Sequence, residues 1–254
     1  MIGLKTHCKV ALVVRREEDR LRRYVHVATG NYNPTTSRVY TDLGLLTTDE
    51  EVALTPRICS TLTGYSRQSD YRWKPFVAPV NVRERFMSLI ERETAHQRAG
   101  RKARIIVKIN SLTDVRIIRA LYEASQAGVP IDLIIRGVCM LRPGVPGLSE
   151  TIKVRSIVGR LLEHSRIFYF GNGGDQEVLI GSADWMSRNL DHRVEVVVPI
   201  KDDRLKERIE SQILAAYLKD TVKARMLMPD GTYDRLLPAD GEEPFNCQEY
   251  FVEL

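Results

Sequence analysis

Short apolar runs and amphipathic segments alternate through the middle of this chain. The runs at residues 105–109, 131–137 and 151–157 are rich in Ile and Val and have the length of buried strands. Residues 82–100 and 113–127 carry apolar side chains at helical spacing. Strands and helices that alternate with short connections predict a parallel sheet covered by helices, and therefore an α/β fold.

Both ends of the chain add further elements to this pattern. Residues 6–14 and 22–29 are predicted to form two strands, with the charged turn at 15–20 in solvent. We expect a helix to begin near 47–51 and a short helical approach at 158–163. The later predicted elements are strands at 167–170, 177–181 and 193–200, a helix over 203–218 and a hairpin around 229–232.

An irregular stretch at residues 64–81, rich in Gly, Ser and Pro, predicts a domain boundary near residue 75. Residues 1–74 would then form a first α/β lobe and residues 75–254 a second lobe with a polar C-terminal tail, in which we see no chemistry. Only Met1 to Leu4 precede the candidate catalytic segment that begins at Lys5. We therefore expect the first lobe to be N-terminally truncated and the chain to be the C-terminal part of a longer protein.

Composition limits the class of protein. A net charge of +5 and a pI near 9.0 favour an anionic partner without selecting one. The four cysteines lie far apart in the sequence, so reduced thiols in a cytoplasmic protein are expected. No apolar run approaches the roughly 20 residues that span a bilayer.

Candidate chemistry begins with two histidines, each followed two residues later by a cation. His7 precedes Lys9, and His164 precedes Arg166, in each case beside an apolar run. Side chains two apart on a strand point to the same side, so each imidazole would lie beside its cation. An imidazole nitrogen can attack phosphorus while the cation offsets charge on the phosphoryl oxygens. Two such half-sites predict two related lobes that meet at one pocket.

Further candidate groups follow the predicted strands. Arg136 ends the strand at 131–137, and the long loop at 139–149 comes directly after it. Of the remaining histidines, His26, His96 and His192 lack a partner at useful spacing and are interpreted as structural or exposed.

The paired histidines resemble those of the phospholipase D superfamily, in which each of two lobes contributes one histidine to a phosphoryl-transfer site. The full motif requires His, Lys two residues later and Asp seven residues after the His. Val14 and Gly171 occupy those Asp positions here, and the second copy has Arg166 in place of Lys.

One branch of that superfamily is a closer match. The sequence resembles the C-terminal half of the histidine-phosphorylating polyphosphate kinases over essentially its whole length. The segments that carry the resemblance are residues 3–9, 29–32, 38–42, 108–112, 142–150, 163–166 and 182–189.

The resemblance implies specific roles and partners. His7 would be the phosphorylated nucleophile, and Tyr40, Arg136 and His164 would contact the nucleotide or its phosphates. Lys9 has no family role that we can carry over, and we infer its catalytic part from spacing. The transition state spreads negative charge over three oxygens, which Lys9, Arg136, Arg38 and Arg166 would offset. The substrates would be ATP or ADP and inorganic polyphosphate, with Mg²⁺ held by ligands outside this chain and no metal site within it.

The same resemblance implies a homo-oligomer in the complete enzyme and, in some members, peripheral association with a membrane; no nucleic-acid partner is expected. Two alternatives stay open at this point. One is a phosphodiesterase of the phospholipase D type, which the missing Asp residues disfavour. The other is a non-catalytic fragment that only binds polyanions.

Overall fold

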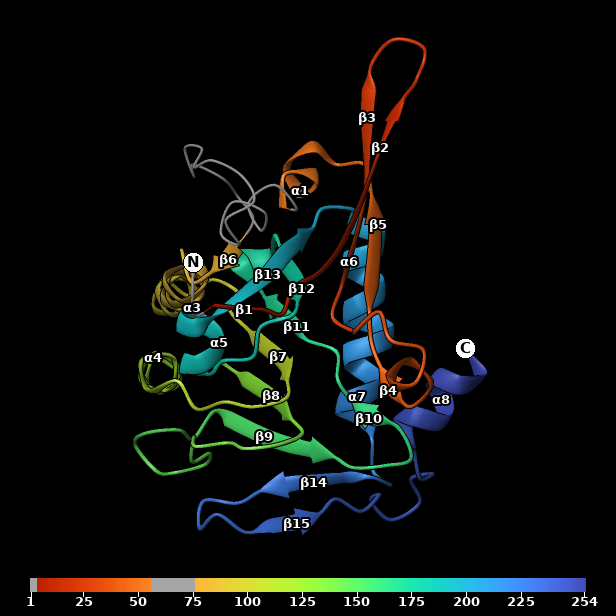
Figure 1. Cartoon of the computed structure of the whole chain (residues 1–254). Coiled ribbons are helices and arrows are strands. Elements are labelled where there is room, and N and C mark those ends of the chain that lie inside the picture. The colour runs from red at the N-terminus through yellow and green to blue at the C-terminus, as the bar shows by residue number, and fades with distance from the viewer. Residues whose placement is uncertain (1–3, 56–75) are drawn as a thin grey trace.

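A ten-stranded mixed sheet forms the centre of this computed structural model, which describes residues 4–55 and 76–254 (Figure 1). The strand order is β1-β13-β12-β11-β7-β8-β9-β14-β15, and β6 also pairs with β13. The α/β prediction is confirmed, but within this described sheet only the β7–β8, β8–β9 and β1–β13 pairs are parallel. The strands are β1 (Lys5–Thr6), β6 (Phe76–Ala78), β7 (Ile105–Ile109), β8 (Ile131–Ile135), β9 (Ile152–Ile157), β11 (Ile167–Phe170), β12 (Glu177–Gly181), β13 (Arg193–Ile200), β14 (Ala224–Leu227) and β15 (Tyr233–Arg235).

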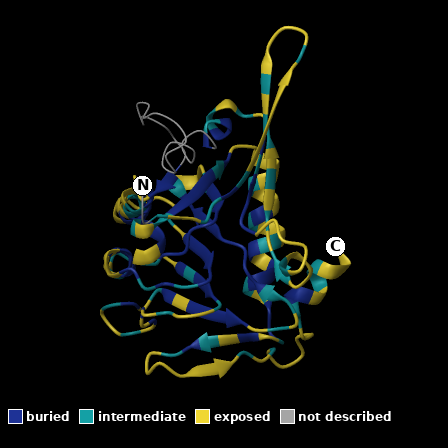
Figure 2. Cartoon of the chain, in the orientation of Figure 1, coloured by how far each residue is buried: buried dark blue, intermediate teal, exposed yellow. Residues whose placement is uncertain are grey.

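Helices cover both faces of this sheet, which explains why its central strands are apolar on both sides (Figures 1 and 2). Alternate residues of a strand point to opposite faces. Ile105 and Val107 pack toward α3 and α4, whereas Ile106 packs into the cluster that includes Ile209 and Leu214. The helices are α3 (Val82–Arg98), α4 (Val115–Gln126) and α5 (Ser187–His192) on one side, and α6 (Asp203–Arg208), the π-helical η3 (Ile209–Leu214) and α7 (Ala215–Lys219) on the other.

A second, three-stranded sheet extends away from the body of the molecule as an arm (Figure 1). It contains β2 (Lys9–Arg16), β3 (Leu21–Ala28) and β5 (Gly44–Thr47). The predicted hairpin and its exposed charged turn are confirmed, and the far end of the arm is exposed (Figure 2). The remaining elements are η1 (Thr36–Arg38), β4 (Tyr40–Thr41), α1 (Glu50–Ala53), β10 (Leu162–Glu163), η2 (Asn172–Gly174) and α8 (Cys247–Glu253).

Two local predictions are wrong. The continuous strand expected over residues 6–14 is broken at His7, because β1 joins the large sheet and β2 joins the arm. The helical approach expected at 158–163 is instead a bend followed by β10, which pairs in parallel with β4. In both cases the deciding hydrogen bonds go to segments distant in sequence, which local periodicity does not encode.

Strands from before the predicted domain boundary pair with strands from after it. β1 pairs with β13, and β4 pairs with β10, so early and late segments are joined twice. The boundary itself, near residue 75, lies outside the described residues, and the division into lobes at 1–74 and 75–254 stays a prediction. Within residues 4–55 and 76–254, no helix combines the length and apolar character that crossing a bilayer requires.

Candidate active site

His7 occupies the break between β1 and β2, where the chain passes from one sheet to the other. The backbone N–H groups of His7 and Cys8 both donate to the Val194 carbonyl of β13, each at 2.9 Å. The imidazole Nδ1 lies 2.9 Å from both carboxylate oxygens of Glu195, which is fully buried. Glu195 also accepts a hydrogen bond from the Ser182 hydroxyl. A proton on Nδ1 facing this carboxylate leaves the lone pair of His7 on Nε2.

Lys9 lies against the same imidazole. Its Nζ is 3.0 Å from His7 Nε2 and 3.1 Å from His7 Nδ1, and it donates to the His7 carbonyl at 2.6 Å. Lys9 is buried, and burial lowers its pKa to about 8; Glu195 opposes this shift and Arg166 adds to it. The arrangement thus keeps a cation next to the nitrogen that can act as a nucleophile.

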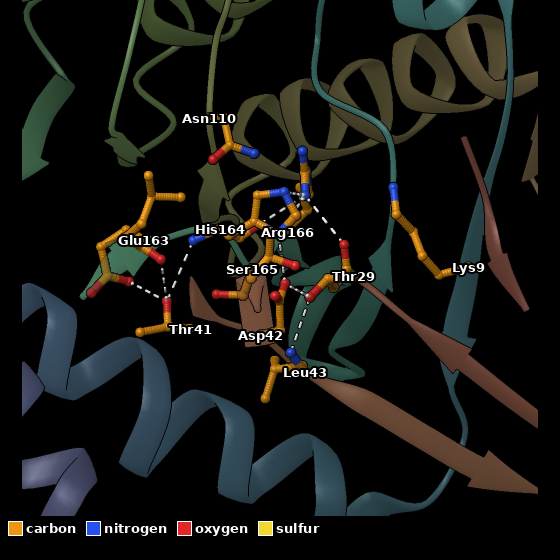
Figure 3. Close-up of polar contacts among 12 residues, drawn as sticks. Lys9, Thr29, Thr41, Asp42, Leu43, Asn110, Glu163, His164, Ser165 and Arg166 are labelled. Atoms are coloured by element: carbon orange, nitrogen blue, oxygen red, sulfur yellow. Dashed lines mark hydrogen bonds and ion pairs between the residues drawn. The ribbon is translucent and has the colours of Figure 1, made fainter. Parts of the chain in front are cut away.

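His164 repeats this geometry at the end of β10. Its Nδ1 lies 2.8 Å from Asp42 Oδ1, and the Thr29 hydroxyl donates to the same oxygen at 2.7 Å (Figure 3). Arg166 NH1 lies 3.1 Å from His164 Nε2 and donates to the His164 carbonyl at 2.8 Å. Burial lowers the pKa of His164, and Asp42 opposes this shift without reversing it, so the site favours the neutral form of the imidazole.

Each histidine is oriented by a carboxylate from the other half of the chain. His7 takes its carboxylate and hydroxyl from the second half of the chain, and His164 takes its own from the first half. Thr29 and Asp42 are separated by 13 residues, and so are Ser182 and Glu195. Each half therefore supplies one histidine to its own half-site and a hydroxyl–carboxylate pair to the other.

A chain of hydrogen bonds fixes the cations of the second half-site. Asp184 accepts from Nε and NH2 of Arg166 at 3.2 and 3.1 Å, and the Asn110 N–H donates to Asp184 at 2.7 Å. Arg136 Nε donates both to Asn110 Oδ1 at 3.0 Å and to the Glu163 carbonyl at 2.8 Å. Half-buried Arg136 is thus tied to the residue that precedes His164.

Tyr40 packs against His164, with ring centroids 4.9 Å apart and planes inclined by 49°. It also lines a pocket of about 310 Å³ with a largely apolar wall and several polar groups. The other lining residues are Thr41, Asp42, Leu43, Leu161, Ser165, Ile213, Tyr217, Phe251 and Val252. The volume of this pocket lies at the lower end of the range that is typical of small-molecule pockets.

Electrostatic and backbone contacts join the two half-sites. The positive charge of Arg166 lowers the pKa of Lys9, and the negative charge of Asp42 raises it. Arg166 NH1 also donates to the Thr29 carbonyl at 3.3 Å. Figure 3 shows Lys9 to one side of the cluster formed by His164, Arg166 and Asp42. The structure therefore brings the predicted residues His7, Lys9, Tyr40, Arg136 and His164 into one connected region.

Other candidates lie outside this network. Arg38 is exposed in η1. His26 contacts the Tyr32 hydroxyl, His96 contacts Arg101, and His192 is exposed at the end of α5. Among the residues that the structure describes, no group of three or more His, Cys, Asp or Glu side chains could hold a metal ion.

Sequence reasoning missed the groups that orient the histidines, namely Thr29, Asp42, Ser182 and Glu195. The repeated spacing of 13 residues is the one signal that could have found them. Of the motif positions that lack Asp, Val14 is exposed on the arm and Gly171 packs against the backbone of Arg104. Carboxylates from elsewhere in the chain therefore partner both imidazoles.

Comparison with known proteins identifies the family. The model for polyphosphate kinase C-terminal domain 2 matches residues 76–248, and the model for C-terminal domain 1 matches residues 1–68. The chain belongs to the polyphosphate kinase family. The predicted resemblance is confirmed.

Individual polyphosphate kinases match along the whole chain. The enzyme from Synechocystis sp. is 57% identical over 99% of this chain and 34% of its own length, and the one from Pseudomonas aeruginosa is 47% identical over 100% and 36%. The chain thus spans about a third of the length of the curated relatives it matches. The crystal structure of polyphosphate kinase from Porphyromonas gingivalis gives a TM-score of 0.91 at 38% identity, covering all of this chain and 39% of that one.

A more distant likeness extends to the phosphatidylserine synthase of Haemophilus influenzae. Its crystal structure gives a TM-score of 0.53 at 10% identity over 91% of this chain and 66% of that one. At this identity the likeness shows a shared fold and nothing of the reaction.

Proposed function

We propose that this chain is the catalytic region of a polyphosphate kinase that transfers the terminal phosphoryl group of ATP to inorganic polyphosphate, reversibly, through a phosphohistidine on His7. The observation that carries the proposal is the exchanged pair of half-sites. Each has an imidazole whose Nδ1 faces a carboxylate of the other half, and a cation beside its Nε2.

The reaction consists of two displacements at phosphorus. In the first, His7 Nε2 attacks the γ-phosphorus of ATP; the N–P bond forms and the P–O bond to ADP breaks. In the second, a terminal oxygen of polyphosphate attacks the same phosphorus, and the N–P bond breaks to return the lone pair to Nε2. The Nδ1 proton stays against Glu195, which stabilises the positive charge that the imidazole gains.

Positioning and charge supply the catalysis, since negative charge spreads over the phosphoryl oxygens in the transition state. Lys9 is next to the attacking nitrogen, and Arg166 next to His164 Nε2. A bound phosphate favours the charged form of His164, which Asp42 stabilises. His164 then donates a hydrogen bond to a phosphoryl oxygen.

The nucleotide would bind with its base in the pocket beside Tyr40, while Arg136 contacts its phosphates. Of the carboxylates at the site, Glu195 and Asp42 are engaged by the histidines and Asp184 by Arg166. These residues do not suit a resident Mg²⁺. Any Mg²⁺ would enter on the nucleotide phosphates with ligands from outside the described residues.

Labelling tests the reaction directly. An enzyme of full family length that carries this region is mixed with ATP labelled at the γ-phosphorus. We expect protein-bound label in an acid-labile, base-stable bond, as a P–N linkage requires, and its transfer to added polyphosphate. The His7→Ala variant should acquire none.

Two outcomes would contradict this function. Label released only to water would indicate hydrolysis of the terminal phosphoanhydride of ATP instead of transfer to polyphosphate. Polyanion binding that falls steeply with salt and is unchanged in His7→Ala, without any labelling, would indicate a binding module.

Self-association and peripheral membrane attachment also belong to the proposal. Light scattering tests the first, and vesicle flotation of the same enzyme tests the second.

A further inference from the structure

The segment that carries His164 has little regular structure of its own to hold it. β10 contains only Leu162 and Glu163, and its pairing with β4 is flanked by the bond from Leu162 N–H to the Val39 carbonyl at 2.8 Å and that from His164 N–H to the Thr41 carbonyl at 3.2 Å. So short a ladder leaves the position of the imidazole dependent on other contacts.

The C-terminal helix α8 supplies such contacts through the side-chain amide of Gln248. The amide oxygen accepts from Leu161 N–H at 2.9 Å, and the amide nitrogen donates to the Leu161 carbonyl at 2.8 Å and to Glu163 Oε1 at 2.7 Å. Gln248 is 5% exposed. Gly159 packs so closely that a Cβ there would lie 2.9 Å from Gln248 Cδ. The amide is therefore fitted to this segment.

The start of α8 is itself anchored to the body of the molecule. Cys247 N–H donates to Oδ2 of buried Asp220 at 2.9 Å, and Asn246 accepts from Gln248 N–H at 3.1 Å. The other oxygen of Asp220 accepts three backbone N–H groups of the turn that leads into β14. Gln248 thus extends from a fixed support.

Both neighbours of His164 are held by the same buried cluster. The other oxygen of Glu163 accepts from the Thr41 hydroxyl at 2.9 Å and pairs with Lys108 Nζ at 3.0 Å. Lys108 Nζ also donates to the Ser165 hydroxyl at 2.8 Å. The residues before and after His164 are consequently linked through Lys108, and the first of them is linked to α8.

We propose that Gln248 is a positioning residue for His164: its amide couples α8 to Leu161 and Glu163 and so sets where the imidazole meets the phosphoryl group. This inference rests on the proposed role of His164. It assigns a function to the C-terminal tail, in which the sequence had indicated no chemistry.

Replacing the amide by an apolar group of the same chain length is the first test. In an enzyme of full family length, Gln248→Met should lower kcat by roughly 10- to 100-fold, since a shift of about 1 Å at a reacting group can cost roughly 100-fold. KM for ATP should stay within about twofold. Glu249→Ala is the matched control, because this neighbouring side chain on α8 is exposed, and it should keep the activity of the parent.

The second variant, Gln248→Glu, gives a readout that a structural role would not produce. It places a carboxylate against Glu163, and two carboxylates in contact share one proton. Lys108, Tyr217 and Cys247 also face this cluster. On its open side Gln248 shares a pocket with the charged residues Arg160, Lys223, Glu249 and Glu253. All of these groups are unchanged in the variant. As pH falls from about 8 to about 6, the shared proton restores a donor toward Glu163, so kcat of Gln248→Glu should rise relative to that of the parent.

The outcomes separate this inference from the proposed function. Loss of kcat in Gln248→Met at unchanged KM and unchanged thermal midpoint, with recovery of Gln248→Glu at low pH, supports the positioning role. The positioning role is overturned if both variants keep the kcat of the parent. It is also overturned if kcat falls only in proportion to the fraction of unfolded protein and Gln248→Glu does not recover at low pH. If the parent enzyme itself makes no polyphosphate, the proposed function fails instead.

Discussion

At the scale of single residues, Lys9 is buried although its proposed role requires a positive charge. Burial lowers its pKa from 10.5 to about 8, so the cation is present below pH 8 and is lost as the pH rises through that value. We predict that kcat/KM falls above about pH 8 for this reason. Lys9→Arg should abolish this alkaline limb, since arginine stays charged, while exposed Lys5→Arg should retain it. A pH–rate profile with the same limb in Lys9→Arg would refute the assignment.

The carboxylates that face the two imidazoles give the next prediction. Glu195→Gln should slow phosphohistidine formation by roughly 10²- to 10⁴-fold, because the amide no longer fixes the Nδ1 proton or stabilises the charged ring. Asp42→Asn should also slow labelling, but by a smaller factor, because His164 contacts a phosphoryl oxygen and does not form the N–P bond. Rapid-quench measurement of labelled protein checks both variants. Equal slowing of labelling in the two variants would argue against distinct roles for the two histidines.

The sequence could predict the histidines and their cations because each pair is separated by only two residues. It could not predict the carboxylates in the same way. Asp42 meets His164 across 122 residues, and Glu195 meets His7 across 188. Such contacts are made by the fold, and no local pattern marks the acids as partners.

At the scale of elements, the close approach of β12 and β13 places Glu195 within reach of His7. A Cβ added at Gly181 would lie 2.7 Å from Val197 Cα and closer still to the Val196 carbonyl. We expect Gly181→Ala to destabilise the chain by roughly 1 to 3 kcal/mol and to displace Ser182 and Glu195. A urea unfolding curve with an unchanged midpoint would show that the strands can separate without cost.

Elements with strong periodicity were predicted correctly, and those that depend on remote partners were not. Buried β7 and amphipathic α4 lie within about two residues of their predicted bounds. By contrast, β10 exists only because β4 pairs with it, and Gln248 secures the residue before it. A two-residue strand has no periodicity from which it could be recognised.

At the scale of the whole molecule, the two halves are interleaved. β1 extends the sheet of the later residues, β4 pairs with β10, and each half orients the histidine of the other. The sequence predicted two matched half-sites, but their exchange of carboxylates appears only in the structure. This exchange makes either half-site incomplete by itself.

The most direct measurement of the central claim is a crystal structure of a full family-length enzyme carrying this region, with ADP and vanadate as the mimic of the transferring phosphoryl group. We predict His7 Nε2 within about 3 to 3.5 Å of vanadium and His164 Nε2 within about 2.6 to 3.2 Å of a vanadate oxygen. Imidazoles that face separate cavities, or vanadate bound to neither ring, would contradict the account.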